Sequence, residues 1–188
     1  MKKYPTNKIR NLALVGHSGS GKTTLTESIL VKTGLKSKIG RVEEGNTTSD
    51  FGGQEIKRQI SIGTSIIPVE WKDSKINIID TPGYLDFKGE VYSSLRASEA
   101  ALVLIDATSG IEVGTEKVLN YTKKIELPRI IFVNKMDKEN ANFAKVVSDL
   151  HIQYSNRVVP FTLTLGEGED FKGIIDVLNK KAYEYDGY

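Results

Sequence analysis

The sequence contains no cysteine, which excludes a disulfide scaffold, a cysteine-ligated zinc site and a thiol nucleophile. Its only two histidines, His17 and His151, are far apart in the sequence, so we do not expect a histidine-rich metal site. No apolar run approaches the roughly 20 residues of a membrane span, and the basic N-terminus leads directly into a glycine-rich segment, unlike a signal peptide. We therefore expect a cytoplasmic protein that makes no membrane contact.

A strong charge of either sign is also lacking. The 26 Lys and Arg residues nearly balance the 24 Asp and Glu residues, which leaves a net charge of +2. This balance gives no indication of nucleic-acid binding from bulk charge. The 188 residues suffice for one domain or slightly more, with a sizeable core, and we expect a monomer.

Short apolar runs recur along the chain and predict buried strands. Most runs are continuous rather than alternating, as expected for a parallel sheet covered on both faces. Apolar residues fall at helical spacing in 118–125 and 143–150. The runs lie at 12–15, 76–79, 101–105 and 130–133, with a further strand expected at 158–163. This alternation predicts an α/β fold with a mostly parallel sheet and helices on both faces.

One section departs from this alternation. Residues 61–70 are typical of a strand, and a polar turn at 72–75 joins them to the strand at 76–79. Because the turn is short, the two strands must pair antiparallel, and Pro68 places the first of them at the sheet edge. The preceding residues 36–59 are polar and aperiodic, which indicates a disordered or functional loop.

Residues 16–23 form the first motif, G-H-S-G-S-G-K-T, which matches G-x-x-x-x-G-K-[ST] between an apolar strand and a helix-forming segment. Glycines let several backbone N–H groups point at one anion, and the dipole of the following helix adds to this. We expect Lys22 to reach the β- and γ-phosphates of a nucleotide and the Thr23 hydroxyl to bind Mg²⁺. A plain glycine-rich turn is disfavoured, since every fixed position and both flanks fit.

The second motif is D-T-P-G, at 80–83 and at the carboxyl end of a predicted strand. Asp80 there can hold Mg²⁺ directly or through water, and Gly83 offers an unhindered N–H to a γ-phosphate. Taken alone, D-x-x-G is more often a turn or a helix N-cap. Its place after a parallel strand favours the functional interpretation.

The third motif is N-K-M-D, at 134–137, again after a strand. Asp137 can accept hydrogen bonds from both N1 and the exocyclic amine of guanine, whereas adenine would leave this carboxylate unpaired. Asn134 can bond to the base edge, and the stem of Lys135 can lie over the ring. The three motifs in this order predict a guanine nucleotide as the ligand.

These residues resemble translational GTPases, and most closely elongation factor G. The likeness runs from about residue 8 to the end of the sequence. The stretches that carry it are 45–50, 54–55, 58–62, 78–87, 128–137, 141–143 and 166–173. The resemblance implies the G-domain fold of P-loop NTPases, GTP and GDP as substrate and product, and Mg²⁺ as cofactor. It also implies binding to ribosomal RNA and proteins through the full-length protein.

Site residues follow from the motifs and the resemblance together. We expect Thr23, Ser61 and Asp80 to hold the metal, and Lys22, Gly83 and Tyr84 to serve catalysis. Residues expected to contact the nucleotide are Gly16, His17, Ser18, Gly19, Ser20, Gly21, Lys22, Thr23, Thr24, Asp80, Thr81, Pro82, Gly83, Tyr84, Asn134, Lys135, Met136 and Asp137. Residues 36–60 (switch I) and 80–96 (switch II) should respond to loss of the γ-phosphate.

The chain also departs from the family pattern. Gly19 replaces an aspartate of the phosphate loop, Ser61 replaces a threonine that binds Mg²⁺, and Tyr84 replaces the histidine that positions the attacking water. A phenol can orient water, but it does not protonate as easily as an imidazole. These departures resemble a divergent branch of elongation factor G-like proteins.

The resemblance further implies how the chain is divided. We expect residues 1–155 to form the G-domain core, and 156–188 to supply a last core strand and the start of an inserted subdomain. The family's fifth motif, S-A-[LK], and its later domains have no match before Tyr188. We therefore expect part of a longer protein.

Three functions agree with these residues. The first is a GTPase that couples hydrolysis to ribosomal translocation or a related step and is slow without the ribosome. The second is a slowly hydrolysing GTP switch that acts as a ribosome-protection or regulatory module, which Gly19 and Tyr84 favour. The third is an ATP-using P-loop enzyme, against which the N-K-M-D motif argues.

Overall fold

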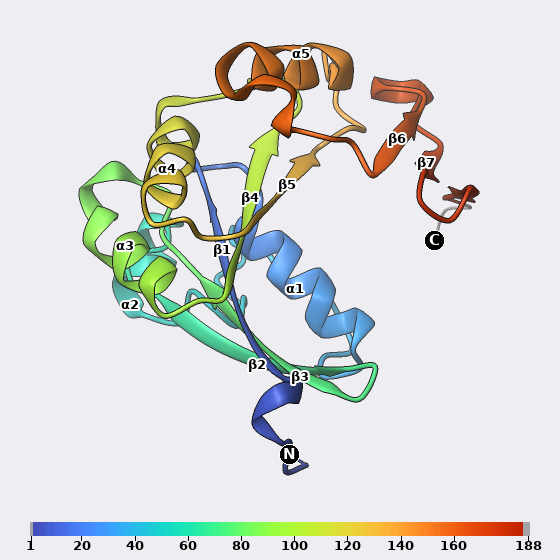
Figure 1. Ribbon diagram of the computed structural model, residues 1–188. Coiled ribbons are helices and arrows are strands. Elements are labelled where there is room, and N and C mark those ends of the chain that lie inside the picture. Colours follow the sequence, from blue (N-terminus) through green and yellow to red (C-terminus); the bar gives the residue numbers. More distant parts are fainter. Residues whose placement is uncertain (1, 186–188) are drawn as a thin grey trace. The chain divides into compact units, whose positions relative to one another are not determined.

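The computed structural model describes residues 2–185, so the end of the expected segment 156–188 lies outside the described residues. Its main element is a five-stranded sheet with the strand order β2-β3-β1-β4-β5 (Figure 1). All four strands predicted from continuous apolar runs at 12–15, 76–79, 101–105 and 130–133 are present. The strands are β1 (Ile9–Gly16), β2 (Ser65–Trp71), β3 (Ser74–Asp80), β4 (Ala100–Asp106) and β5 (Arg129–Asn134).

The central strand β1 pairs parallel with both β3 and β4, whereas β2 pairs antiparallel with β3 at the sheet edge. Pro68 lies in this edge strand, where a missing N–H is tolerated, as predicted. A two-residue turn joins β2 to β3, and both of its residues, Lys72 and Asp73, have positive φ. This is the primed turn geometry whose twist matches that of paired strands.

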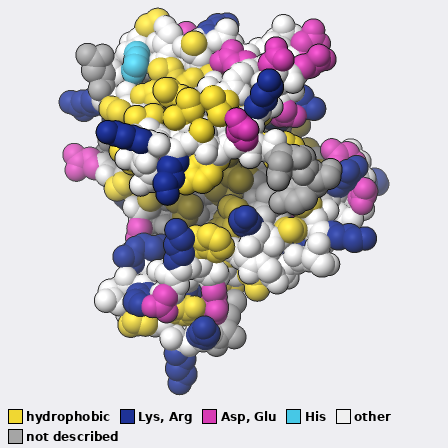
Figure 2. Space-filling view, turned by 90° about the vertical axis from the view of Figure 1, so that its right-hand side faces the viewer, with side chains coloured by type: hydrophobic (Ala, Val, Ile, Leu, Met, Phe, Trp, Pro, Cys, Tyr) yellow, Lys and Arg dark blue, Asp and Glu magenta, His cyan; other side chains and the backbone are white. Residues whose placement is uncertain are grey.

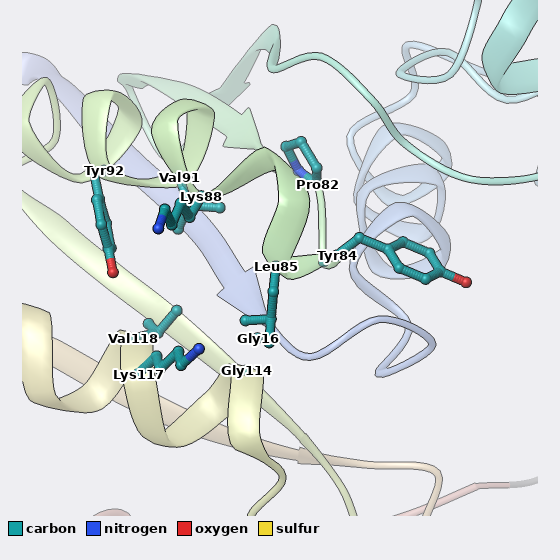
Figure 3. Close-up of a pocket in the computed structure, with 11 residues that line it drawn as sticks. Gly16, Pro82, Tyr84, Leu85, Lys88, Val91, Tyr92, Gly114, Lys117 and Val118 are labelled. Carbon is teal, nitrogen blue, oxygen red and sulfur yellow. The ribbon is translucent and has the colours of Figure 1, made fainter.

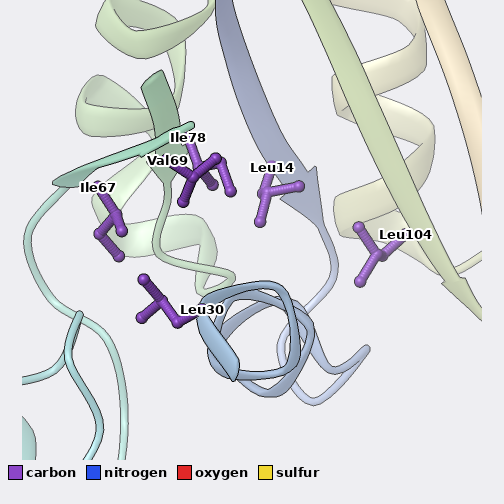
Figure 4. Packing of buried hydrophobic residues seen from close by; sticks show 6 residues of the cluster. All are labelled: Leu14, Leu30, Ile67, Val69, Ile78 and Leu104. Atoms are coloured by element: carbon purple, nitrogen blue, oxygen red, sulfur yellow. The ribbon is translucent and has the colours of Figure 1, made fainter. Parts of the chain in front are cut away.

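Helices cover the sheet on both faces, which confirms the predicted α/β class. Figure 1 shows α1 (Lys22–Lys32) on one side of β1, with α3 (Lys88–Arg96) and α4 (Val113–Lys124) on the other. Leu30 of α1 and Leu14 of β1 belong to one buried cluster drawn in Figure 4. The cluster consists of Leu14, Leu30, Ile67, Val69, Ile78 and Leu104. This packing holds α1 against the sheet directly after the glycine-rich loop.

Two expectations need correction. The segment 36–59 contains a six-residue helix, α2 (Gly53–Arg58), which is too short to show helical periodicity in the sequence. The strand expected at 158–163 as the last of the main sheet is also wrong, because β6 (Thr162–Leu165) begins later and joins a separate sheet. Its partner there is β7 (Gly173–Asp176), which also pairs with β8 (Lys181–Glu184). Since an apolar run does not specify its partner, the sequence could not distinguish the two sheets.

The chain divides into two compact units. The first comprises Val113–Phe132 and the chain up to Leu104, and the second comprises Ile105–Glu112 and the chain from Val133 onward. The second unit contains α5 (Phe143–Tyr154) and the three-stranded sheet. Short 3-10 turns complete the elements at Thr6–Lys8, Leu85–Phe87, Ser155–Arg157 and Gly168–Asp170.

The surface agrees with the nearly even charge balance. The face drawn in Figure 2 carries Lys and Arg as well as Asp and Glu side chains, and hydrophobic side chains are gathered in its upper half. Among the described residues, no helix has both the length and the apolar character needed to cross a bilayer.

Candidate functional site

In the first unit, the loop between β1 and α1 has the geometry of an anion-binding loop. β1 ends at Gly16 and α1 begins at Lys22, with Gly21 at the N-cap in the left-handed region. Gly16 has φ +145, and a Cβ there would lie 2.4 Å from the Leu104 carbonyl oxygen, so the close approach of β4 requires glycine. The loop therefore leads directly onto the N-terminus of α1, where backbone N–H groups and the helix dipole favour an anion.

Lys22 is buried at the start of this helix. Its ammonium donates to the carbonyl oxygens of His17, at 2.9 Å, and Gly16, at 3.2 Å. Burial lowers the pKa of Lys22 to about 8, although the carboxylates of Asp80 and Asp50 act in the opposite direction. The side chain thus keeps its charge at neutral pH, as a phosphate-binding lysine must.

Three side-chain oxygen atoms from distant parts of the sequence lie around the Thr23 hydroxyl. This hydroxyl lies 3.2 Å from Asp80 Oδ2, 3.4 Å from Ser61 Oγ and 3.5 Å from Asp50 Oδ2. The structure therefore brings together the three predicted metal-binding residues, Thr23, Ser61 and Asp80, which lie far apart in the sequence. It adds Asp50, whose side chain is also buried.

This oxygen cluster has the chemistry that Mg²⁺ requires. Burial raises the pKa of Asp80 to about 6 and also raises that of Asp50, so a nearby cation would stabilise both charged forms. Asp80 Oδ1 is buried and accepts no hydrogen bond from the described residues. Across residues 2–185, no group of three or more His, Cys, Asp or Glu forms a complete metal cage. Mg²⁺ is commonly held by one or two carboxylates together with substrate phosphates, and these residues fit that arrangement.

The D-T-P-G segment lies directly against the phosphate loop. The buried Thr81 hydroxyl donates to the Leu14 carbonyl oxygen at 2.6 Å and ties the segment to β1. A Cβ at Gly83 would lie 2.6 Å from both Lys22 Nζ and Ser18 Cα, so only glycine fits here. The Gly83 backbone is thus placed where it can contact a group bound in the loop.

Tyr84 differs from its neighbours in this segment. Its side chain is 43% exposed, and Figure 3 shows the ring directed away from the other residues that line the adjoining pocket. That pocket lies between the D-T-P-G segment, α3 and α4, and Leu85, Val91 and Val118 contribute its apolar side chains. The role of Tyr84 in orienting water stays a prediction.

Two contacts connect α4 with the phosphate loop and with α3. The Gly114 N–H donates to His17 Nδ1 at 3.3 Å, so His17 links the phosphate loop to the start of α4. Tyr92 of α3 stacks on Tyr121 of α4 with ring centroids 4.2 Å apart. Through these two contacts, α4 touches both the phosphate loop and α3 within this unit.

In the second unit, N-K-M-D begins with Asn134, the last residue of β5. Lys135 has φ +59, which is uncommon for a residue other than glycine. Its ammonium pairs with Asp106 at 2.7 Å, and the Thr108 N–H and hydroxyl donate to the other oxygen of that carboxylate. These contacts orient Lys135 without involving Asp137, which is exposed.

Met136 is the anchor of this motif rather than an exposed binding residue. It is buried with Ala107 and Ala141, and its carbonyl oxygen accepts from the Gly168 N–H at 2.9 Å. The Asn134 carbonyl oxygen accepts from the Ala107 N–H at 2.9 Å. The buried methionine thus fixes the backbone that presents the flanking polar residues.

Other predicted contact residues differ in exposure. Ser20 and Pro82 are buried, Ser18 is half-buried, and Gly19 and Thr24 are exposed. The sequence analysis did not identify four acidic residues whose carboxylates contact or position the site residues: Asp50, Asp106, Glu27 and Glu55. Asp50 stands at the end of the family-like stretch 45–50, which was the one available signal for it.

The first unit has the parts of a P-loop nucleotide-binding protein: a strand, a glycine-rich loop with a buried lysine, a helix, and hydroxyl and carboxylate oxygens close together. The N-K-M-D motif indicates that the nucleotide is of the guanine type. The family model for the elongation factor Tu GTP-binding domain matches residues 7–184. The chain therefore belongs to this family and is a GTP-binding domain of the translation-factor type.

Elongation factors G are among the similar proteins. The chain is 42% identical over 178 residues to that of Mycoplasma genitalium and 40% identical over 185 residues to that of Gluconobacter oxydans. These matches cover 95% and 98% of this chain but 26% of each relative, so the chain spans about a quarter of their length. A crystal structure of a Thermus thermophilus protein matches 96% of this chain and 27% of its own, with a TM-score of 0.90 and 41% identity.

Proposed function

We propose that this domain binds GTP with Mg²⁺ and hydrolyses it to GDP as the nucleotide motor of an elongation factor G-like protein. The observation that carries the proposal is the convergence of Thr23, Ser61 and Asp80 beside the phosphate loop. We infer that the whole protein acts on the ribosome in the cytoplasm, as a monomer, in translocation or a related step. Residues from about 156 onward would begin an inserted subdomain, which agrees with their separate sheet.

Each group has a defined part in the proposed reaction. Thr23, Ser61 and Asp80 would hold the metal, with Asp50 beside them, and Lys22 would neutralise charge on the phosphates. When bound, the metal supplies positive charge that stabilises the transferring phosphoryl group. The Gly83 N–H would donate a hydrogen bond to the γ-phosphate, so that switch II would respond to its presence. Asp137 would select guanine. Catalysis would therefore consist mainly of positioning and charge stabilisation.

Single-turnover hydrolysis of GTP, measured with and without ribosomes, tests this proposal. We expect guanine nucleotide binding by the chain alone, and slow hydrolysis that ribosomes accelerate. ATP in excess should not displace labelled GDP. Displacement by ATP would contradict the assignment of N-K-M-D as the guanine-selecting motif.

A second candidate function is a GTP switch without useful hydrolysis, which acts by occupying the ribosome. Tyr84 favours it, because an exposed phenol does not take up a proton as easily as an imidazole does. Multiple-turnover phosphate release with ribosomes separates the two functions. A stimulated rate that falls in Tyr84→Ala supports the GTPase, and a negligible rate in both proteins supports the switch.

A further inference from the structure

Two buried glutamates from different helices bind the backbone on either side of the segment that carries Asp50 and Ser61. Glu27 of α1 is fully buried, and Glu55 of α2 is 9% exposed. Glutamate is seldom buried to this extent unless its carboxylate is paired or hydrogen-bonded. Neither residue belongs to the three nucleotide motifs, so their burial requires another explanation.

The Glu27 carboxylate binds the first part of switch I at three points. Its Oε1 accepts from the Thr48 N–H at 2.6 Å, and its Oε2 accepts from the Gly40 N–H at 2.8 Å and the Lys36 ammonium at 2.5 Å. Burial alone would raise the pKa of Glu27, but Lys36 and the two backbone N–H groups offset this and hold the pKa below its usual value. The carboxylate is therefore charged at neutral pH and fastens residues 36–48 to α1.

Gly40 shows how close this contact is. A Cβ at Gly40 would lie 2.6 Å from Glu27 Oε2, 2.7 Å from the Asn46 carbonyl oxygen and 2.8 Å from Lys36 Nζ. Any larger residue would have to push the loop away from the carboxylate. Gly40 thus provides a steric means of testing the contact without changing a charge.

The Glu55 carboxylate acts on the other end of the segment. Its Oε2 accepts from the Gly52 N–H at 2.9 Å, which caps α2, and its Oε1 accepts from the N–H groups of Ile62 and Gly63 at 2.9 and 3.1 Å. Ile62 and Gly63 directly follow Ser61. The position of the Ser61 hydroxyl beside Thr23 therefore depends on Glu55.

We propose that Glu27 and Glu55 are positioning residues for segment 49–61, Glu27 from α1 outside the segment and Glu55 from within it, so that Asp50 and Ser61 face Thr23. Glu27 fixes Thr48, just before the segment, and Glu55 fixes Ile62, just after it. The inference rests on the proposed function for the identity of the cation. It also divides switch I: residues 36–48 stay attached to α1, and only 49–61 responds to the metal and phosphate.

The test uses Glu27→Gln and Glu55→Gln in the 188-residue chain, with Glu43→Gln as control because Glu43 is an exposed residue of the same loop. Tryptic cleavage after Arg41, Lys57 and Arg58 is followed without nucleotide. We then measure the Mg²⁺ concentration at which the protein keeps half of the maximal amount of bound fluorescent GDP. Because each carboxylate makes several charge-assisted hydrogen bonds, we expect cleavage and the Mg²⁺ requirement both to rise about tenfold, with no change in the control.

Gly40→Ala and Lys36→Gln keep the proposal testable if a glutamate variant does not fold. Both should weaken the Glu27 contact and raise the cleavage rate. Rates within twofold of the control in all variants would overturn the proposal. Faster cleavage with an unchanged Mg²⁺ requirement would also overturn it, because the carboxylates would then hold the loop without positioning its metal-facing residues. Failure of the parent chain to bind GDP would contradict the proposed function. The cleavage rates would still test whether Glu27 and Glu55 hold the loop.

Discussion

In the first unit the charged side chains of the phosphate and metal site are buried, whereas in the second unit Asp137 is exposed beside the buried Met136. Lys22, Asp50 and Asp80 are buried together, and burial shifts all three of their pKa values toward the neutral forms. The second unit pairs its partly exposed lysine, Lys135, with Asp106. The difference agrees with the proposed ligands: phosphate and metal would be bound by charge in a dry site, while a base would be selected by hydrogen bonds at an accessible edge.

Lys22→Ala should have the largest effect on nucleotide affinity. If the Lys22 ammonium makes two charge-assisted hydrogen bonds of about 2 kcal/mol each to β-phosphate oxygens of GDP, their loss should weaken GDP binding about 1000-fold. Lys32→Ala, an exposed position near the end of the same helix, is the control. Titration with fluorescent GDP measures both. An affinity loss of less than tenfold would show that the buried lysine is not the phosphate ligand.

Asp137→Ala should weaken GDP binding about 100-fold and leave stability within about 0.5 kcal/mol of the parent, because the side chain is exposed. The parent should prefer GDP over IDP, which lacks the exocyclic amine, and this preference should vanish in the variant. Glu139→Ala, exposed two residues away, is the control. A retained preference for GDP would contradict base selection by Asp137.

Asp80→Asn should separate stability from function in the first unit. The carboxylate of Asp80 is charged above about pH 6 in the folded protein, against an ordinary value of 3.8, so burying its charge opposes folding at pH 7. Without metal, the variant should be more stable by about 1–3 kcal/mol at pH 7, and the gain should vanish below about pH 4. Mg²⁺-dependent retention of GDP should fall at the same time.

Thermal unfolding in EDTA between pH 4 and 7 checks this stability change, with the exposed Asp86→Asn as control. Reduced stability of Asp80→Asn at pH 7 would show that the hydrogen bonds of the carboxylate outweigh its burial.

Glu27 should show the opposite and smaller pH dependence. Its pKa in the folded protein is below the usual value, so it stabilises the fold above about pH 4.3, and this contribution is lost as the pH falls. The stability difference between the parent and Glu27→Gln should therefore be greatest at pH 7 and shrink toward pH 3. Thermal unfolding across this range measures it. A difference that grows toward low pH would contradict a charged, hydrogen-bonded Glu27.

Local patterns predicted the main sheet well. Continuous apolar runs identified β1, β3, β4 and β5, and the turn at 72–75 with Pro68 identified the antiparallel edge strand β2. The family assignment followed from the same motifs and is confirmed by the family model. Helix α2 escaped prediction because Glu55 stabilises it through a cap and contacts with residues seven and eight positions away, not through periodicity.

The sequence by itself determined the nucleotide class, because phosphate loops and guanine-selecting motifs depend on residue types at fixed short spacings. It also placed these motifs at strand ends. Only the tertiary structure decided that Asp50 faces Thr23, and that Glu27 and Glu55 bind the backbone at Thr48 and Ile62, on either side of segment 49–61. These contacts join residues that are not neighbours in the sequence, and no local pattern records burial, which strengthens the interactions of their charges.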